Sequence, residues 1–288
     1  MKKIIFYFIL TSLVFGETKK WDAHSAYLLP QKRWEMGLFQ PFRYGYSESI
    51  EYSAHPLWFF VMPNLSIKKS QSDFAGFTSA SQYKMVYPTP FLNMIAKEGT
   101  MGIIAPEFRM PPMLGLSASW LMSKTIFPFV SPYSLIGLDL TLNVGLDLGV
   151  TFGDLDTRST IDIPLVYHRL GVYYNKWGIH TGLDVQKNIS EKIGVLVDFD
   201  LRLLPGLGEV QIDPDASKLM GEYSLEHKFL LIWNKSENFR VLTGYKFVMG
   251  EYPYGSDMRL LPYIPMAETW VPIIEFQWAR KKTIAYPF

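Results

Sequence analysis

A strict alternation of apolar and polar residues over 138–153 constrains this chain more than any other feature. Every even position there is Leu, Val or Phe, and every odd position is Asp, Thr, Asn or Gly. Successive side chains of a β-strand point to opposite faces, so the pattern predicts one strand with a wholly apolar face. At ~3.3 Å per residue this strand is roughly 50 Å long, whereas strands of globular proteins usually have about 5–6 residues. Tilted by about 45°, it is long enough to cross a bilayer core.

The same alternation recurs along the rest of the chain. Clear examples are residues 177–185, 193–203, 223–233, 239–249 and 270–278, and weaker ones are 34–44, 50–58, 74–87, 114–122 and 161–173. A further short strand near 99–106 keeps the number of strands even, as bacterial barrels require. We therefore expect an all-β chain that forms a single antiparallel transmembrane β-barrel of about twelve strands, with ten or fourteen as alternatives. The role of residues 88–112, which are rich in proline, stays open between wall and inward-folded loop.

Residues 1–16 have the pattern of an export signal. Lys2 and Lys3 precede an apolar stretch, and Val14 and Gly16 are small enough to flank a signal peptidase site. The apolar stretch is too short to span a bilayer. We expect a signal peptide at residues 1–16, an N-terminal periplasmic arm at 17–32 and an outer-membrane barrel at 33–288.

The composition excludes several classes of function. There are 28 Lys and Arg residues against 27 Asp and Glu, giving a net charge of +1, so no cationic field is available for nucleic acid. The chain has no cysteine, which removes disulfides, thiolate metal sites and cysteine nucleophiles. No cofactor motif is present, and we expect neither a cofactor nor a metal.

Aromatic residues concentrate at the ends of the expected strands. In a bilayer, rings with a polar edge sit at the level of the headgroups and form girdles. The expected girdle consists of Trp34, Trp58, Trp120, Trp177, Trp233, Trp270 and Trp278. The alternative is a soluble sandwich whose core rings lie near turns, but long alternating strands are hard to pack in that way.

If the apolar face meets lipid, the opposite face lines the lumen. The expected lumen-lining residues are Asp139, Asn143, Asp147, His180, Asp184, Asp198, Asp200, Arg202, Glu226, Lys228, Arg240, Lys246 and Glu275. Two interpretations remain open. The charges either pair and fill the lumen, or they form a polar conduit that orients a small solute.

Catalysis is not expected, although an outer-membrane hydrolase is an alternative. His168 and His180 are predicted on neighbouring strands, with Asp162 and Asp184 nearby. No serine shares their spacing in a recognisable motif, so a nucleophile and its base cannot be paired from the sequence.

Together, the export signal, the alternating strands, the aromatic strand ends and the terminal Phe288 resemble bacterial outer-membrane β-barrel proteins as a class. The resemblance covers the whole mature chain and rests on pattern, without a specific motif. It implies contact with outer-membrane lipid and recognition by the barrel assembly machinery through Phe288. The mixed charges of the inner face, and the lack of a cofactor or catalytic motif, favour a passive channel or uptake route for a small solute. The alternatives are a structural or surface-interaction barrel with a plugged lumen, and a soluble periplasmic β-rich lipid carrier.

Overall fold

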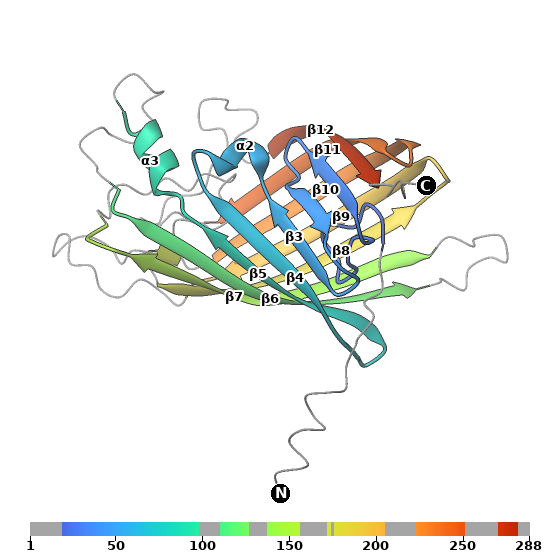
Figure 1. Ribbon diagram of the computed structural model, residues 1–288, viewed down its shortest axis with the longest axis horizontal. Coiled ribbons are helices and arrows are strands. Elements are labelled where there is room, and N and C mark those ends of the chain that lie inside the picture. The colour runs from blue at the N-terminus through green and yellow to red at the C-terminus, as the bar shows by residue number, and fades with distance from the viewer. Residues whose placement is uncertain are drawn as a thin grey trace, which may run out of the picture.

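A computed structural model describes residues 19–97, 110–126, 137–155, 172–173, 176–204, 223–250 and 270–281. The chain forms one closed antiparallel barrel of twelve strands (Figure 1). The first strand pairs with the last, and every other strand pairs with its neighbours in sequence. The expectation of an all-β barrel with twelve strands is confirmed.

The strands are β1 (Arg33–Gly37), β2 (Phe42–Gly45), β3 (Ile50–Ala54), β4 (Asn64–Phe74), β5 (Phe77–Val86), β6 (Met113–Ile126), β7 (Leu138–Thr151), β8 (Trp177–Asn188), β9 (Ile193–Leu203), β10 (Tyr223–Ser236), β11 (Phe239–Gly250) and β12 (Trp270–Lys281). Two short helices, α2 (Pro56–Phe59) and α3 (Thr89–Ile95), lie in the connections after β3 and β5. Among the described residues no helix is both long and apolar enough to cross a membrane.

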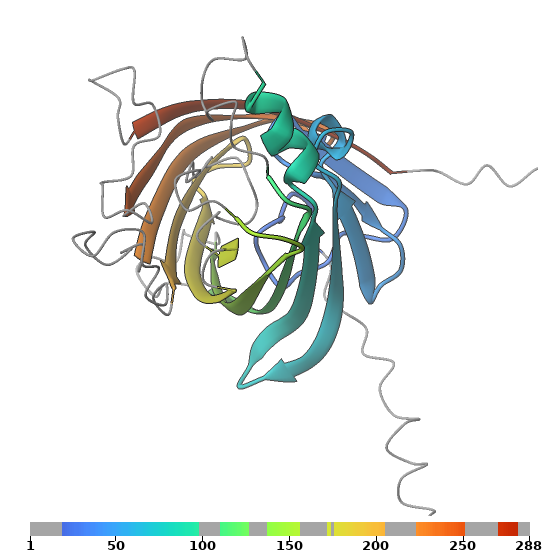
Figure 2. The ribbon, with the colours of Figure 1, turned by 90° about the vertical axis from the view of Figure 1, so that its left-hand side faces the viewer.

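The connections differ between the two ends of the barrel. Short turns at 46–49, 75–76, 189–192 and 237–238 lie at the end where β12 finishes, which we call the short-turn end. The turn at 75–76 is tight because Ala75 and Gly76 both have positive φ. The connections that carry α2 and α3 lie at the opposite end, which faces the viewer in Figure 2.

The number of strands is right, but two of the expected strands differ and one observed strand was not expected. The segment 34–44 divides into β1 and β2, because the backbone turns where Gly37 N–H donates to the Gln40 carbonyl and Pro41 offers no N–H. The segment 50–58 ends early, because Pro56 begins α2. The strand β4 was missed, since polar residues such as Lys69 and Gln71 interrupt its outer face.

The expected strands at 99–106 and 161–173 lie outside the described residues, apart from Val172 and Tyr173. The wall closes without them, because β5 pairs directly with β6 and β7 pairs directly with β8.

The barrel has an inverted distribution of polarity. On β7, the outward residues Leu142, Val144 and Leu146 are 37%, 47% and 41% exposed. Their neighbours Asp139 and Asp147, on the inner face, are 8% and 7% exposed. Soluble monomers rarely expose a contiguous apolar surface of this kind, and such surfaces mark contact with a membrane or with another protein.

Candidate functional site: the lumen and its N-terminal plug

The polar residues predicted to line the lumen all lie on the inner side of the wall. Asp139, Asp147, His180, Asp198, Glu226, Arg240 and Glu275 are buried. Asn143, Asp184, Asp200, Arg202, Lys228 and Lys246 are partly exposed. The interior therefore gathers both signs of charge.

Most of the tryptophans predicted to form girdles lie on the outside, and five of the seven are near strand ends. Trp34, Trp233 and Trp278 lie at the short-turn end, and Trp177 and Trp270 lie at the opposite end, which carries α2 and α3. Two positions differ from the prediction. Trp120 lies in the middle of β6, where its ring packs against Phe74, and Trp58 lies in α2 against Phe91 rather than on a strand.

The N-terminal segment 19–30, which we call the plug, lies inside the barrel at the short-turn end. Leu28 and Leu29 are at most 1% exposed. Ala26 and Leu28 pack against the inward side chains of Ala80 and Leu121. Residues 17–32 were expected to form a periplasmic arm. The described residues 19–30 lie instead against the inner wall of the barrel, because their apolar side chains are buried there.

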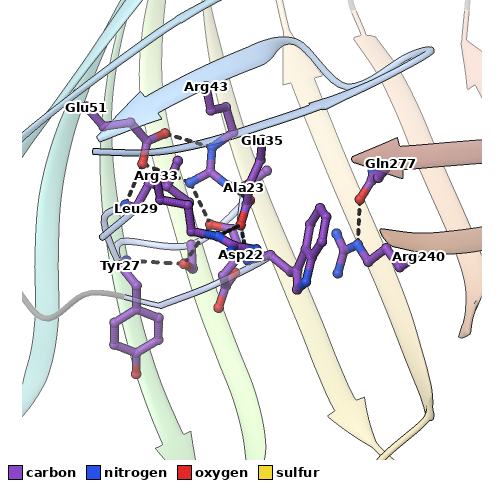
Figure 3. Close-up of polar contacts among 12 residues, drawn as sticks. Asp22, Ala23, Tyr27, Leu29, Arg33, Glu35, Arg43, Glu51, Arg240 and Gln277 are labelled. Carbon is purple, nitrogen blue, oxygen red and sulfur yellow. Dashed lines mark hydrogen bonds and ion pairs between the residues drawn. The ribbon is translucent and has the colours of Figure 1, made fainter. Parts of the chain in front are cut away.

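A buried ionic network holds the plug against β1–β4, and Arg43 lies at its centre (Figure 3). The Arg43 Nε and Nη2 atoms donate to the two carboxylate oxygens of Glu51, each at 2.8 Å. Arg43 Nη1 donates to Glu35 at 3.1 Å, and Nη2 also donates to the backbone carbonyl of Asp22 at 3.2 Å. Arg33 Nε completes the network with a 2.8 Å bond to Glu35. Such paired, two-point bonds are what buried charges require.

The same charged side chains bind the backbone of the plug. Glu35 accepts the N–H of Trp21 at 2.9 Å, and Glu51 accepts the N–H of Leu29 at 2.8 Å. The Lys68 ammonium donates to the carbonyls of Ser25 and Tyr27 at 2.9 and 3.2 Å. These bonds satisfy backbone groups that have no sheet partner. Charged side chains of the wall therefore bind specific backbone groups of the plug, and the plug is an integral part of the folded barrel.

Two arginines of the wall also contact the aromatic ring of Trp21 in the plug. The indole of Trp21 lies between Arg33 and Arg240, whose guanidinium carbons are 5.1 and 4.9 Å from the ring centroid. Arg240 donates in addition to Gln277 on β12. A ring between two guanidinium groups fits a cation–π arrangement.

A second charged cluster lines β8–β11, where side chains keep exposed surface. Asp198 binds the Lys228 ammonium. Glu226 pairs with Lys246 and with Arg202, the latter at 3.4 Å. The side chains of Lys246 and Arg202 are 27% and 24% exposed. This side of the lumen therefore presents alternating charges that the described plug does not cover completely.

One set of potential metal ligands joins the plug to this cluster. The ligand atoms of His24, Asp184 and Asp198 all lie within 4.8 Å of one another. The Lys228 ammonium already binds Asp198. This positive charge opposes a divalent cation at the same place.

A serine, a histidine and an aspartate form a hydrogen-bonded row across β6, β7 and β8. His180 Nε2 lies 2.9 Å from Ser119 Oγ, and His180 Nδ1 lies 3.0 Å from Asp147 Oδ2. All three residues are buried. The row is possible because Gly145 lies between Ser119 and His180 in register, and a Cβ there would overlap the imidazole.

Sequence analysis missed this row. It grouped His180 with Asp184, whereas the structure pairs His180 with Asp147; His168 and Asp162 lie outside the described residues. The useful signal was the parity: Ser119, Asp147 and His180 occupy inward positions on three consecutive strands. Parity does not give the register between strands, so only the structure could show that these three residues lie side by side.

The described residues at the two ends of the barrel differ in character. At the short-turn end a cleft of about 370 Å³ opens beside the plug, lined by Lys20 and Trp21 and by wall residues that include Glu237 and Arg240. At the other end, apolar side chains of α2, α3 and the wall form a buried cluster around Leu92.

No known family matches the sequence, and no curated protein shows significant similarity to it. The chain is thus defined here by its architecture, a closed twelve-stranded antiparallel barrel that contains its own N-terminal segment.

Proposed function

We propose that this chain is an outer-membrane β-barrel that provides a narrow, passive route for a small polar solute beside its plug. The observation that carries the proposal is the combination of an apolar outer face with a charged inner face. A lipid bilayer satisfies the outer face, and water or a polar solute satisfies the inner one.

The orientation follows from the class. Outer-membrane barrels have short periplasmic turns and longer outer connections. On this basis the short-turn end and the plug face the periplasm. The signal at residues 1–16 and recognition of Phe288 by the barrel assembly machinery belong to the same proposal; both lie outside the described residues.

The charged cluster on β8–β11 supports a solute route. Arg202 and Lys246 keep exposed surface next to Glu226 and Asp198, so both signs of charge remain accessible on one side of the lumen. Rows of opposite charge favour small zwitterionic or polar solutes over large ones. The soluble lipid-carrier alternative is not supported, since a lipid cargo needs an apolar interior and this one is charged.

The plug favours a second candidate, a structural or surface-interaction barrel with a closed lumen. Its network to Arg43, Glu51 and Lys68 fills the short-turn end on the side of β1–β4. Conductance distinguishes the two functions, because a closed barrel carries no current.

The test uses the purified barrel in planar bilayers and in liposome swelling. We expect a small conductance for the wild type and a larger one for a variant lacking residues 17–30, because the plug then leaves the lumen. Replacing Lys246 and Arg202 by Gln should shift the reversal potential towards cation selectivity. Lys124→Gln is the matched control, because Lys124 lies exposed on the outer face of β6. Silence of both the wild type and the deletion variant rejects the route, and silence of the wild type alone favours the closed barrel.

A further inference from the structure

We propose that Ser119, His180 and Asp147 form a hydrolytic site inside the barrel that cleaves small carboxylic esters. This activity goes beyond the proposed solute route and does not depend on flux across a membrane. It requires only that a small ester reaches the lumen.

The geometry gives each residue one role. Asp147 accepts the Nδ1–H of His180 at 3.0 Å, which leaves Nε2 as the acceptor for the Ser119 hydroxyl at 2.9 Å. This assignment of the imidazole protons follows from the hydrogen-bond partners. A serine hydroxyl is a weak nucleophile until an adjacent base takes its proton, and the base must be oriented by a third group. Ser119 on β6 is the nucleophile, His180 on β8 is its base, and Asp147 on β7 orients that base.

The rigidity of the wall favours this site. Ser119 and His180 both face Gly145 in the ladders of β6–β7 and β7–β8. The imidazole therefore crosses a strand at a position without a side chain and reaches the serine directly. A site on paired strands is held more precisely than one on loops.

Two polar side chains lie beside the serine on the inner face. Lys84 lies opposite Ser117 on the inner face, and Asn143 lies opposite Leu121, so both are diagonal neighbours of Ser119 in the wall. The Lys84 ammonium and the Asn143 amide can donate to the carbonyl oxygen of an ester, where negative charge develops during attack.

The reaction is an ordinary acyl transfer to water. Ser119 Oγ attacks the carbonyl carbon while its proton passes to His180 Nε2. The bond to the leaving alcohol breaks, and the alcohol takes that proton. Water then attacks the acyl-serine with His180 as base, which releases the carboxylic acid and restores the serine.

The surroundings restrict the substrate to compact, polar esters. Gln82 lies directly opposite Ser119 in the wall, with Lys84 and Asn143 on two of the diagonals. The apolar neighbours on the inner face, Ala80 and Leu121, are buried against Leu28 of the plug and are not open to a long acyl chain. Short-chain esters therefore fit better than lipids.

The test treats the detergent-folded barrel with phenylmethylsulfonyl fluoride, a small reagent that sulfonylates activated serines, and locates the label by mass spectrometry. We expect labelling at Ser119 and hydrolysis of p-nitrophenyl acetate. Ser119→Ala should abolish both, and Asp147→Asn should slow both by about 10²-fold or more. Ser224→Ala is the matched control, because Ser224 is a buried inward serine on β10, two strands away from the row of Ser119, His180 and Asp147.

Folding of each variant is checked by its heat-modifiable migration on a gel, so that a loss of labelling is not confused with a loss of the barrel. A folded wild-type protein that is not labelled at Ser119 overturns the proposal. Equal labelling rates for the wild type and Asp147→Asn also overturn it, because a purely structural network gives Ser119 no enhanced reactivity.

Discussion

Replacing Arg43 by leucine tests whether the buried network stabilises the plugged barrel. Arg43 is 2% exposed, and its partners Glu35 and Glu51 are 0% and 2% exposed. The substitution removes bonds of 2.8, 2.8 and 3.1 Å to these two carboxylates and leaves their charge buried. Breaking a buried pair in this way costs about 3–5 kcal/mol, because the two carboxylates lose a bonding cation while they stay out of water. Glu35 keeps its bond to Arg33, so the loss falls mainly on Glu51.

The free energy of unfolding is measured in urea, from tryptophan fluorescence of the barrel folded into vesicles. We expect Arg43→Leu to lower it by about 3–5 kcal/mol. The free energy of unfolding of Arg43→Lys should lie between those of the wild type and Arg43→Leu, because an ammonium keeps the charge and loses the two-point bond to Glu51. The control is Glu237→Gln, which removes the exposed 3.3 Å pair with Lys20 and should cost no more than about 1 kcal/mol. A cost for Arg43→Leu as small as that of the control refutes the reasoning.

Three further predictions follow from the lumen and the outer face. Burial raises the pKa of the Asp22 carboxyl above its ordinary value of 3.8, so the contribution of this group to docking of the plug is fully present below that value and is lost as pH rises through the raised pKa. Asp22→Asn should therefore slow proteolysis of the plug at about pH 7 and reduce the difference in proteolysis rate between about pH 4 and about pH 7. A proteolysis rate with the same pH dependence as in the wild type contradicts this. Gly145→Ala should displace the His180 imidazole, because a Cβ there overlaps the ring, and labelling of Ser119 should fall while the barrel still shows heat-modifiable migration. Leu146→Arg, on the outer face, should lower the free energy of unfolding in vesicles by about 2–4 kcal/mol, and an unaltered value would show that this face does not meet hydrocarbon.

The alternation of residues determined most of the wall. Residues 193–203 form β9 with the expected bounds, and 138–153, 177–185 and 223–233 correspond to β7, β8 and β10. The faces were predictable as well: Asp139 and Leu142 lie inside and outside as their parity indicates. This information is local, because the direction of a side chain in a strand depends only on its position along that strand.

Only the tertiary structure decided what the inner face does. Parity predicted that Asp147 and His180 point inward, but the register between β7 and β8 brought them together and separated His180 from Asp184. The plug was equally invisible, because its backbone is bound by Arg43 and Glu51, which become neighbours only when β2 and β3 pair. Contacts between strands depend on register and closure, and those are set by the whole barrel together, whereas alternation along one strand is written in the sequence itself.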